Sequence, residues 1–292
     1  MAQQNILQII EARKTQIAPK HLKIARYLLS HYEKVAFLSS TQLAKQVGVS
    51  QPTVIRFSQA LGFAKYQNFS EAFQELIKAE LTSADRFNLS LEDDQTISDG
   101  ASNIILREIK TLTRLNQSFP WESFDKALTQ IVQAGGVHIV GTRGSASLAQ
   151  YFGYFLSKVK RHVHVITHGA TEQYDKIRNL NKTDLVVAIA FPRYPRETVE
   201  LVAHCKKRNL KILAITDQPE SPLMPMADYS IIIPITFSTI FDSYCSALCL
   251  FNMLITQTGK KNKRESSKLF DEFEQMARER EFFTSRMRRG DD

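Results

Sequence analysis

Long apolar runs, a signal-like start and paired cysteines are all missing from this chain of 292 residues. No apolar run approaches the roughly 20 residues that a membrane-spanning helix needs, and the first residues contain no apolar signal core. The three cysteines are an odd number and lack the spacing of a disulfide framework. We therefore expect a cytoplasmic protein from a reducing compartment, with no membrane partner.

Groups that could hold a metal or react covalently are also scarce. His162 and His164 alternate in a strand-like run and His168 follows, but a metal site needs more converging ligands. Cys245 and Cys249 stand four apart in an apolar helical run, which favours burial over metal binding. The sequence predicts no metal, no cofactor and no catalytic residue.

Charge is plentiful and unevenly distributed. The whole chain carries a net charge of +8 and has a pI of about 9.3. Residues 1–82 hold ten Lys/Arg against five Asp/Glu, whereas residues 83–100 hold five Asp/Glu against one Arg. Such a basic end followed by an acidic polar stretch is typical of a nucleic-acid-binding module tethered to a second domain. Ordinary surface charge is the alternative explanation.

Residues 38–61, LSSTQLAKQVGVSQPTVIRFSQAL, form the most informative segment. Their apolar positions follow a helical period on both sides of Gly48, which supplies a turn. Ser50 is a favourable N-cap, and Pro52 stands in the first turn, where its missing N–H costs nothing. The apolar positions are Leu43, Ala44, Val47, Val49, Val54, Phe57 and Leu61. This pattern predicts a helix-turn-helix whose second helix can enter a DNA major groove.

The residues expected to face DNA surround the start of this second helix. Base contacts are expected mainly from Gln51 and Thr53, because the N-terminal half of a recognition helix reads the bases. Arg56 can bind a guanine edge or instead pair within its own domain. The complete predicted DNA-binding set is Lys45, Ser50, Gln51, Thr53, Arg56 and Lys65, with the two lysines on phosphates.

The chain divides into two predicted domains. Residues 1–81 read as five short helices, residues 82–100 as a polar linker, and residues 101–292 as an α/β domain that ends in a charged helix from about Lys260 to Arg289. Short, nearly continuous Val/Ile-rich runs alternate with segments of helical length, which indicates a doubly wound parallel sheet. The expected strands are Val137–Val140, Val163–Ile166, Leu185–Phe191, Lys211–Ile215 and Tyr229–Ile233.

The loop after the first strand has the composition of an anion site. Glycines allow a ligand to approach the backbone, a following helix offers free N–H groups, and an arginine can grip phosphate or carboxylate. A tight strand-to-helix turn capped by serines would have the same composition. The predicted ligand-binding residues of this loop are Gly141, Arg143, Gly144, Ser145 and Ser147.

Other candidates follow neighbouring strands. Arg193 follows the third strand, so we expect it at the same carboxyl edge of the sheet as Arg143. Ligands of parallel sheets bind outside this edge. The alternative is that Arg193 and Arg196 pair with Glu197 or face solvent. His168 follows the second strand and is a plausible pocket residue. Asp242 is expected at the start of the last sheet-domain helix, where it either caps the helix or enters the pocket.

Taken together, the two halves resemble the RpiR-type bacterial transcription regulators, which join an N-terminal helix-turn-helix domain to a sugar isomerase (SIS) domain. The residues that carry the resemblance are Gln42 to Ala44, Val49 and Ser50, Thr53 to Phe57, Leu61 to Phe63, Gly141 to Ala149, Arg196 to Leu201, Ile215 to Asp217 and Phe241 to Ser243. The resemblance implies a flavodoxin-like SIS sheet of five strands, a homodimer or homotetramer, and a phosphorylated sugar as effector.

Two departures from the family pattern bear on the effector. SIS domains usually read Gly-x-Gly-x-Ser after the first strand, but Arg143 replaces the second glycine here. After the third strand they usually read Ser-x-Ser-Gly-x-Thr, and residues 190–195 of this chain lack those hydroxyls. A phosphate is then expected on Ser145, Ser147, Arg143 and Arg193. The alternative is a different anion, such as a carboxylate-bearing metabolite.

The leading interpretation is a DNA-binding regulator that senses an anionic metabolite and, as a dimer, binds a pseudo-palindromic operator. A second interpretation is a sugar-phosphate isomerase with an attached DNA-binding domain. It would draw on Glu172, Glu197, Asp242 and His168, although no pair of these is arranged by sequence as an acid/base couple. A third is a DNA-binding scaffold whose SIS domain only oligomerises.

Overall fold

The computed structural model describes residues 6–13, 19–36, 38–77, 82, 84–85, 87–88, 97–169, 171–236 and 241–284. The chain forms two compact units. The first, which we call the helical unit, comprises Met1–Asn103 with Phe237–Ser243, and the second, the sheet unit, comprises Ile104–Thr236 with Tyr244–Asp292. Most of the predicted linker, including residues 89–96, lies outside the described residues. Helix α8 (Ile97–Gln117) begins four residues before the expected start at Ala101.

Six helices make up the described part of the helical unit within residues 1–81. They are α1 (Ile6–Arg13), α2 (Pro19–Ser30), α3 (Tyr32–Val35), α4 (Ser40–Val47), α5 (Gln51–Ala60) and α6 (Tyr66–Ile77). The sequence predicted five, and the additional one is the single turn α3. Edge-to-face rings of Phe57, Phe69 and Phe73 fill the centre of this unit, which gives a domain of about 80 residues its own apolar core.

The sheet unit contains five parallel strands in the order β2-β1-β3-β4-β5. The strands are β1 (Val137–Val140), β2 (Val163–Ile166), β3 (Leu185–Ile189), β4 (Lys211–Thr216) and β5 (Tyr229–Ile232). All five predicted strands are confirmed, and the doubly wound class with them. The ends of β3, β4 and β5 differ from the predicted ends by one or two residues. β3 stops at Ile189 because the chain then turns through Pro192.

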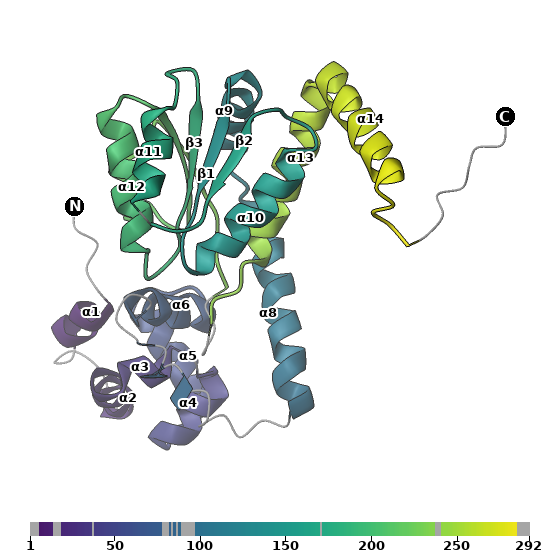
Figure 1. Ribbon diagram of the computed structural model, residues 1–292. Helices are drawn as coiled ribbons and strands as arrows, with labels where there is room; N and C mark the ends of the chain where they lie inside the picture. Colours follow the sequence, from purple (N-terminus) through teal and green to yellow (C-terminus); the bar gives the residue numbers. More distant parts are fainter. Residues whose placement is uncertain are drawn as a thin grey trace. The chain divides into compact units, whose positions relative to one another are not determined.

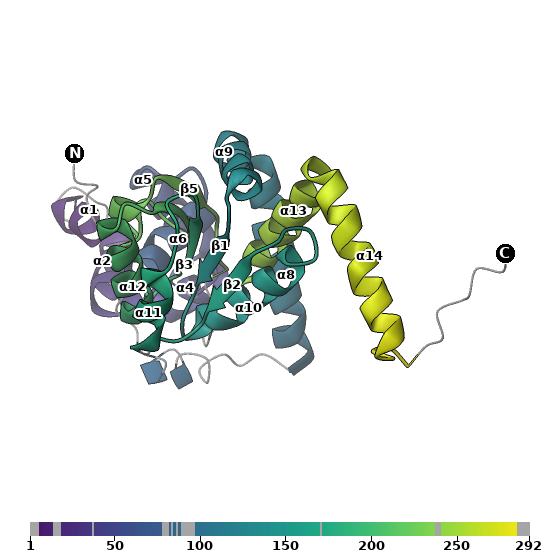
Figure 2. The ribbon, with the colours of Figure 1, turned by 45° about the horizontal axis from the view of Figure 1, so that its top comes forward.

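Helices cover both faces of this sheet (Figures 1 and 2). Helices α9 (Trp121–Gln133), α10 (Gly144–Leu156) and α13 (Cys245–Lys261) pack on one face. Helices α11 (Glu172–Arg178) and α12 (Arg196–Lys207) lie on the other. Gly153 lets α10 approach the sheet closely, because a Cβ at this position would overlap the side chain of Val165 on β2.

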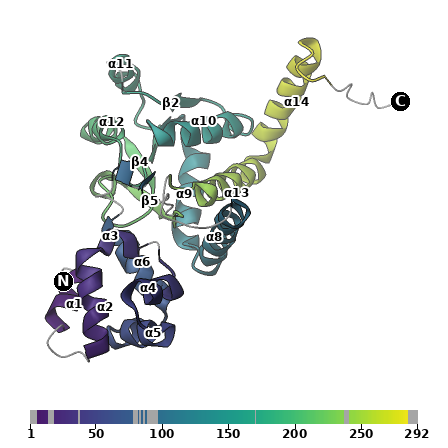
Figure 3. The ribbon, with the colours of Figure 1, turned by 90° about the horizontal axis from the view of Figure 1, so that it is seen from below.

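A separate charged helix follows the last helix of the sheet unit, as expected, but it is shorter than predicted. α13 ends at Lys261, the chain bends at Asn262, and α14 follows over Lys263–Glu279. The prediction placed this charged helix from Lys260 to Arg289, and residues 285–292 lie outside the described part. α14 slants away from the body of the sheet unit in all three views (Figure 3). Within the described residues, no helix combines the length and apolar character that crossing a bilayer requires.

Candidate functional site

The helix-turn-helix is held by local contacts that the sequence encodes directly. Ser39 and Gln42 form a capping box at the start of α4, with bonds of 2.8 and 3.2 Å between side chain and backbone. Gly48 ends α4 in the left-handed conformation with φ of 68°, which glycine adopts without steric cost. Ser50 then precedes α5, and Pro52 lies in its first turn, as predicted.

The two polar groups expected to read bases differ in their surroundings. Gln51 is exposed, and its amide donates to the Ser40 hydroxyl over 2.9 Å, which orients it at the start of α5. Thr53 is only 8 % exposed, and its hydroxyl lies 2.8 Å from that of Ser50. Thr53 therefore contributes to the fold of the turn more than to the outer surface.

The remaining predicted DNA-facing residues are basic and exposed. Lys45 lies on α4 and Arg56 on α5, where its Nε donates to the carbonyl of Pro52. Lys65 is exposed next to Tyr66, whose hydroxyl donates to the Leu38 carbonyl over 2.9 Å. Burial raises the pKa of Tyr66, so it remains a neutral donor. Gln59 is also exposed on α5, three residues after Arg56. Helical spacing could have identified it as a further residue on the face of Arg56.

At the carboxyl edge of the sheet, the loop after β1 adopts an unusual backbone. Gly141 has no room for a side chain, because a Cβ there would lie 2.8 Å from the Ser145 carbonyl oxygen. Arg143 has φ of 55° and ψ of −127°, a region that glycine favours. Arg143 thus holds a backbone conformation that suits glycine, and its side chain is exposed.

The serines of this loop point in different directions. Ser145 is 2 % exposed, so its hydroxyl faces the protein interior. Ser147 is exposed, and its hydroxyl donates to the Gly144 carbonyl over 3.0 Å. Gly144 packs against Tyr244, whose hydroxyl would lie 3.1 Å from a Cβ at that position. An outside ligand can therefore reach Ser147 and Arg143 more directly than Ser145.

Two threonines that sequence reasoning did not single out connect this loop to α12. The Thr142 N–H donates to the Thr198 hydroxyl over 3.1 Å, and the two hydroxyls lie 2.9 Å apart. Both residues are fully buried. Thr198 stands in the first turn of α12, so the pair holds the N-termini of α10 and α12 side by side. Their short side chains in a polar turn gave no sequence signal that they would meet.

The loop after β3 is anchored by a tyrosine. The Tyr194 hydroxyl donates to Oδ1 of Asp217 over 2.8 Å and accepts from the Gln218 amide over 3.0 Å. Burial and the neighbouring carboxylate raise its pKa. Arg193, between this anchor and β3, is exposed with φ of 63°. Arg196 is ion-paired with Glu200 over 2.7 Å and not with Glu197.

The loop after β2 reaches the same corner. Gly169 lies against Glu197 of α12, where a Cβ would be 2.7 Å from the glutamate Cγ. His168 is exposed and accepts from the Gln173 amide over 2.6 Å. The loops that follow β1, β2 and β3 thus gather around the start of α12. We call the exposed residues Arg143, Ser147, His168 and Arg193 at this edge of the sheet the rim.

One of the two alternatives for Asp242 was that it caps the last helix of the sheet unit, and this alternative is wrong. α13 begins at Cys245, and its N-cap is Tyr244, whose ring packs 5.4 Å from that of Phe191 and fixes the chain there. Asp242 itself falls in the segment 237–243 that groups with the helical unit. The expected burial of both α13 cysteines was also wrong, because Cys245 is exposed.

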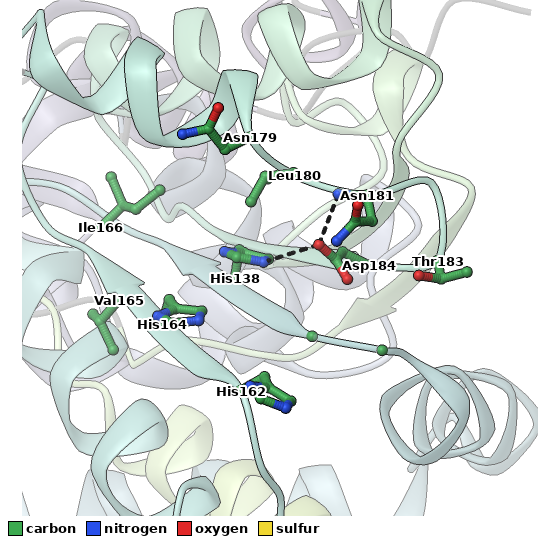
Figure 4. Close-up of a pocket in the computed structure, with 12 residues that line it drawn as sticks. His138, His162, His164, Val165, Ile166, Asn179, Leu180, Asn181, Thr183 and Asp184 are labelled. Atoms are coloured by element: carbon green, nitrogen blue, oxygen red, sulfur yellow. Dashed lines mark hydrogen bonds and ion pairs between the residues drawn. The ribbon is translucent and has the colours of Figure 1, made fainter.

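A separate hollow of about 610 Å³ opens at the opposite, amino-terminal edge of the sheet (Figure 4). His138 and His164 stack across strands β1 and β2 at 5.0 Å, and His138 pairs with Asp184 over 3.4 Å. Burial lowers the pKa of His138. Among its described lining residues, none is a lysine or arginine, so its chemistry suits an anion poorly. No group of three ligating side chains among the described residues could hold a metal ion.

Comparison with known proteins gives matches over both units. Residues 4–80 match the family model described as a helix-turn-helix domain of the rpiR family, and residues 130–257 match the SIS domain. An uncharacterized HTH-type transcriptional regulator from Clostridium perfringens is 23 % identical over 270 residues, 88 % of this chain and 92 % of that protein.

Solved structures agree with the fold. The sugar isomerase domain of an RpiR transcription factor from Sphaerobacter thermophilus aligns with a TM-score of 0.57 and 25 % identity, over 60 % of this chain and 98 % of that one. The NanR protein of Vibrio vulnificus, complexed with ManNAc-6P, aligns with a TM-score of 0.57 and 18 % identity, over 96 % and 100 % of the two chains.

Proposed function

The chain is an RpiR-type helix-turn-helix regulator with a C-terminal SIS domain, and we propose that it controls transcription in response to an anionic metabolite, a phosphorylated sugar or amino sugar. In this proposal the helical unit binds duplex DNA through Lys45, Ser50, Gln51, Arg56 and Lys65, with Thr53 supporting the turn. The protein acts as a homodimer or homotetramer on a pseudo-palindromic operator.

One observation carries the effector proposal. Arg143 and Arg193 both have positive φ, and they follow the adjacent strands β1 and β3. Each such residue costs about 1–3 kcal/mol unless the surroundings enforce it, and strained residues of this kind concentrate at ligand sites. Two guanidinium groups beside two helix N-termini favour a dianionic group such as a phosphate. The related NanR protein, complexed with ManNAc-6P, supports a sugar phosphate as the first candidate.

A thermal-shift and calorimetric titration tests this proposal. The probes are N-acetylmannosamine 6-phosphate, glucose 6-phosphate, their unphosphorylated sugars and citrate. A ligand at 100 times its Kd stabilises the folded protein by about 2.7 kcal/mol. Arg143→Ala and Arg193→Ala should each weaken binding of the active probe at least about tenfold. Arg178→Ala, an exposed arginine on α11, is the matched control. Equal binding by all three variants would contradict the proposed site.

We further propose that the rim binds its ligand without turnover. The ring nitrogen Nε2 of His168 is occupied by the Gln173 amide, and Glu197 packs against Gly169, so neither group is arranged as a base for ring opening. Incubation of the active sugar phosphate with the protein, followed by proton NMR, should show no isomer. A product that disappears in Glu197→Gln would instead establish an isomerase.

A further inference from the structure

Helix α8 carries the most unusual surface of the sheet unit. Four neighbouring apolar side chains are mostly exposed: Ile104 at 58 %, Ile105 at 62 %, Leu106 at 58 % and Ile109 at 55 %. Farther along, Leu115 is buried in the core of the sheet unit. Single exposed apolar residues are common, but four within two turns of one helix form a contiguous patch of the kind that marks an interaction site. We call these four residues the α8 patch.

The charges around the α8 patch restrict what can cover it. Arg107, Lys110 and Arg114 lie along one side of it, next to Leu106, and the one acidic residue within residues 104–117, Glu108, accepts a hydrogen bond from Thr236. A second copy of α8 would therefore bring basic groups against basic groups. Residues 1–82 carry a net charge of +5, so they are equally ill suited to cover the patch. The partner surface should be apolar and acidic.

Helix α14 has that composition from Leu269 onward. It is attached at its start and along one side, where the Ser266 hydroxyl donates to the Val159 carbonyl, Arg161 pairs with Glu272, and the Lys158 ammonium lies 3.7 Å above the ring of Phe273.

Two further apolar side chains of α14 are about half exposed, Phe270 at 47 % and Met276 at 46 %. Asp271, Glu274 and Glu279 accompany them, whereas Arg278 is the one basic residue between 269 and 279. This surface is therefore apolar and acidic.

We propose that α14 of one copy packs on the α8 patch of a second copy. Leu106 and Ile109 lie about one turn apart and form a ridge, with Lys110 and then Arg107 along its basic side. Phe270 and Glu274 are likewise one turn apart on α14. Phe270 packs on this ridge while Glu274 and Asp271 pair with Lys110 and Arg107. α14 projects from its own sheet unit in all three views (Figures 1 to 3).

In a twofold dimer this contact occurs twice, since each copy offers both surfaces. The inference rests on the homodimer of the proposed function and identifies its interface. It also gives α14 a role in assembly, separate from ligand and DNA.

Charge reversal in the full-length protein tests the contact. Sedimentation equilibrium measures the dimer Kd for the wild type, for Arg107→Glu/Lys110→Glu on α8, for Asp271→Lys/Glu274→Lys on α14, and for the chain with all four changes. Each pair should weaken the dimer by about tenfold or more, and the fourfold variant should recover most of the loss, because the charges are again complementary. Lys182→Glu, an exposed lysine before β3, is the matched control, and circular dichroism checks folding.

A photo-crosslinking residue at position 270 gives a second, independent measurement. In a mixture of isotopically light and heavy chains, crosslinks should join the two chains and map to residues 104–110. Crosslinks within one chain, or a dimer whose Kd neither pair changes, would overturn the α14 contact and leave the proposed function intact. A wild type that is monomeric at all concentrations would overturn both this contact and the dimer on which the proposed operator symmetry rests.

Discussion

The hydroxyls of Thr142 and Thr198 lie 2.9 Å apart in the interior of the sheet unit, although 55 residues separate them in the chain. One belongs to the loop that follows β1 and the other to the first turn of α12. Because the Thr142 N–H also donates to Thr198, this single side chain satisfies two polar groups that water cannot reach. The pair sets the spacing between the two helix N-termini on which the proposed effector site depends.

Replacing Thr198 by valine should therefore affect both stability and binding. Thr198→Val keeps the shape but leaves the buried N–H and hydroxyl of Thr142 without their hydrogen-bond partner, which costs about 1–3 kcal/mol of unfolding free energy. Urea denaturation measures this loss. Thr198→Ser, which keeps the hydroxyl, should lose much less. If valine and serine variants are equally stable, the hydrogen bonds do not contribute as the geometry indicates.

Arg143→Gly should separate backbone strain from ligand binding. Glycine adopts φ of 55° and ψ of −127° without steric cost, so the variant should gain up to about 1 kcal/mol in unfolding free energy despite the greater entropy of its unfolded chain. The same change removes the guanidinium and should weaken the anionic effector about tenfold or more. Denaturation and calorimetry on one preparation test both. A lower unfolding free energy for Arg143→Gly than for the wild type would contradict backbone strain at this position.

The two residues first expected to read bases should behave differently. Gln51→Ala should weaken binding to the operator by about 1–3 kcal/mol and relax the preference at one base pair. Thr53→Val should lower the unfolding free energy and leave base preference unchanged, since its hydroxyl already bonds to Ser50. Fluorescence anisotropy at one fixed salt concentration, with operator and random DNA, distinguishes these outcomes. Gln46→Ala, an exposed glutamine on α4, is the control.

Acidification should destabilise the protein through His138. Burial holds its folded-state pKa below the ordinary value, against the opposing effect of Asp184 and with a smaller contribution from His164. As pH falls through about 6.5, the unfolded chain takes up a proton that the folded protein resists, so unfolding free energy falls with pH. His138→Gln should flatten this dependence between about pH 7.5 and 5.5 relative to the wild type. Parallel curves for the variant and the wild type would contradict a contribution of His138.

A side chain at position 153 should destabilise the protein unless the neighbouring Val165 is made smaller. A Cβ there overlaps Val165 on β2, so Gly153→Ala should cost about 1–3 kcal/mol by forcing α10 away from the sheet. Val165→Ala removes the obstructing methyl groups, and the double variant should be more stable than the two separate losses predict. Thermal unfolding of the four proteins completes the cycle. If the two losses in stability simply add, α10 accommodates the new methyl group without pressing on Val165.

The sequence was sufficient where a local pattern determines structure. Apolar runs such as Val137–Val140 are buried on both faces and admit little but a central parallel strand, and Ser39 and Gly48 mark the ends of α4 by their own chemistry.

It was insufficient where the outcome depends on contacts between distant segments. Nothing near Asp242 reveals that Tyr244 packs on Phe191 and delays the start of α13, and nothing near Thr53 reveals its burial. The meeting of Thr142 and Thr198 likewise follows from strand order, which single-segment patterns do not encode.

The rim has a consequence for how such a regulator can change in evolution. Its frame, Thr142 with Thr198 and Tyr194 with Asp217, points inward, while Arg143 and Arg193 point outward. With the effector at the proposed site, mutations at the two outward positions would alter what the rim binds without disturbing the contacts that hold it. A lineage could then acquire a new effector by a few substitutions and retain its old operators, and a protein engineer building a biosensor would have the same freedom.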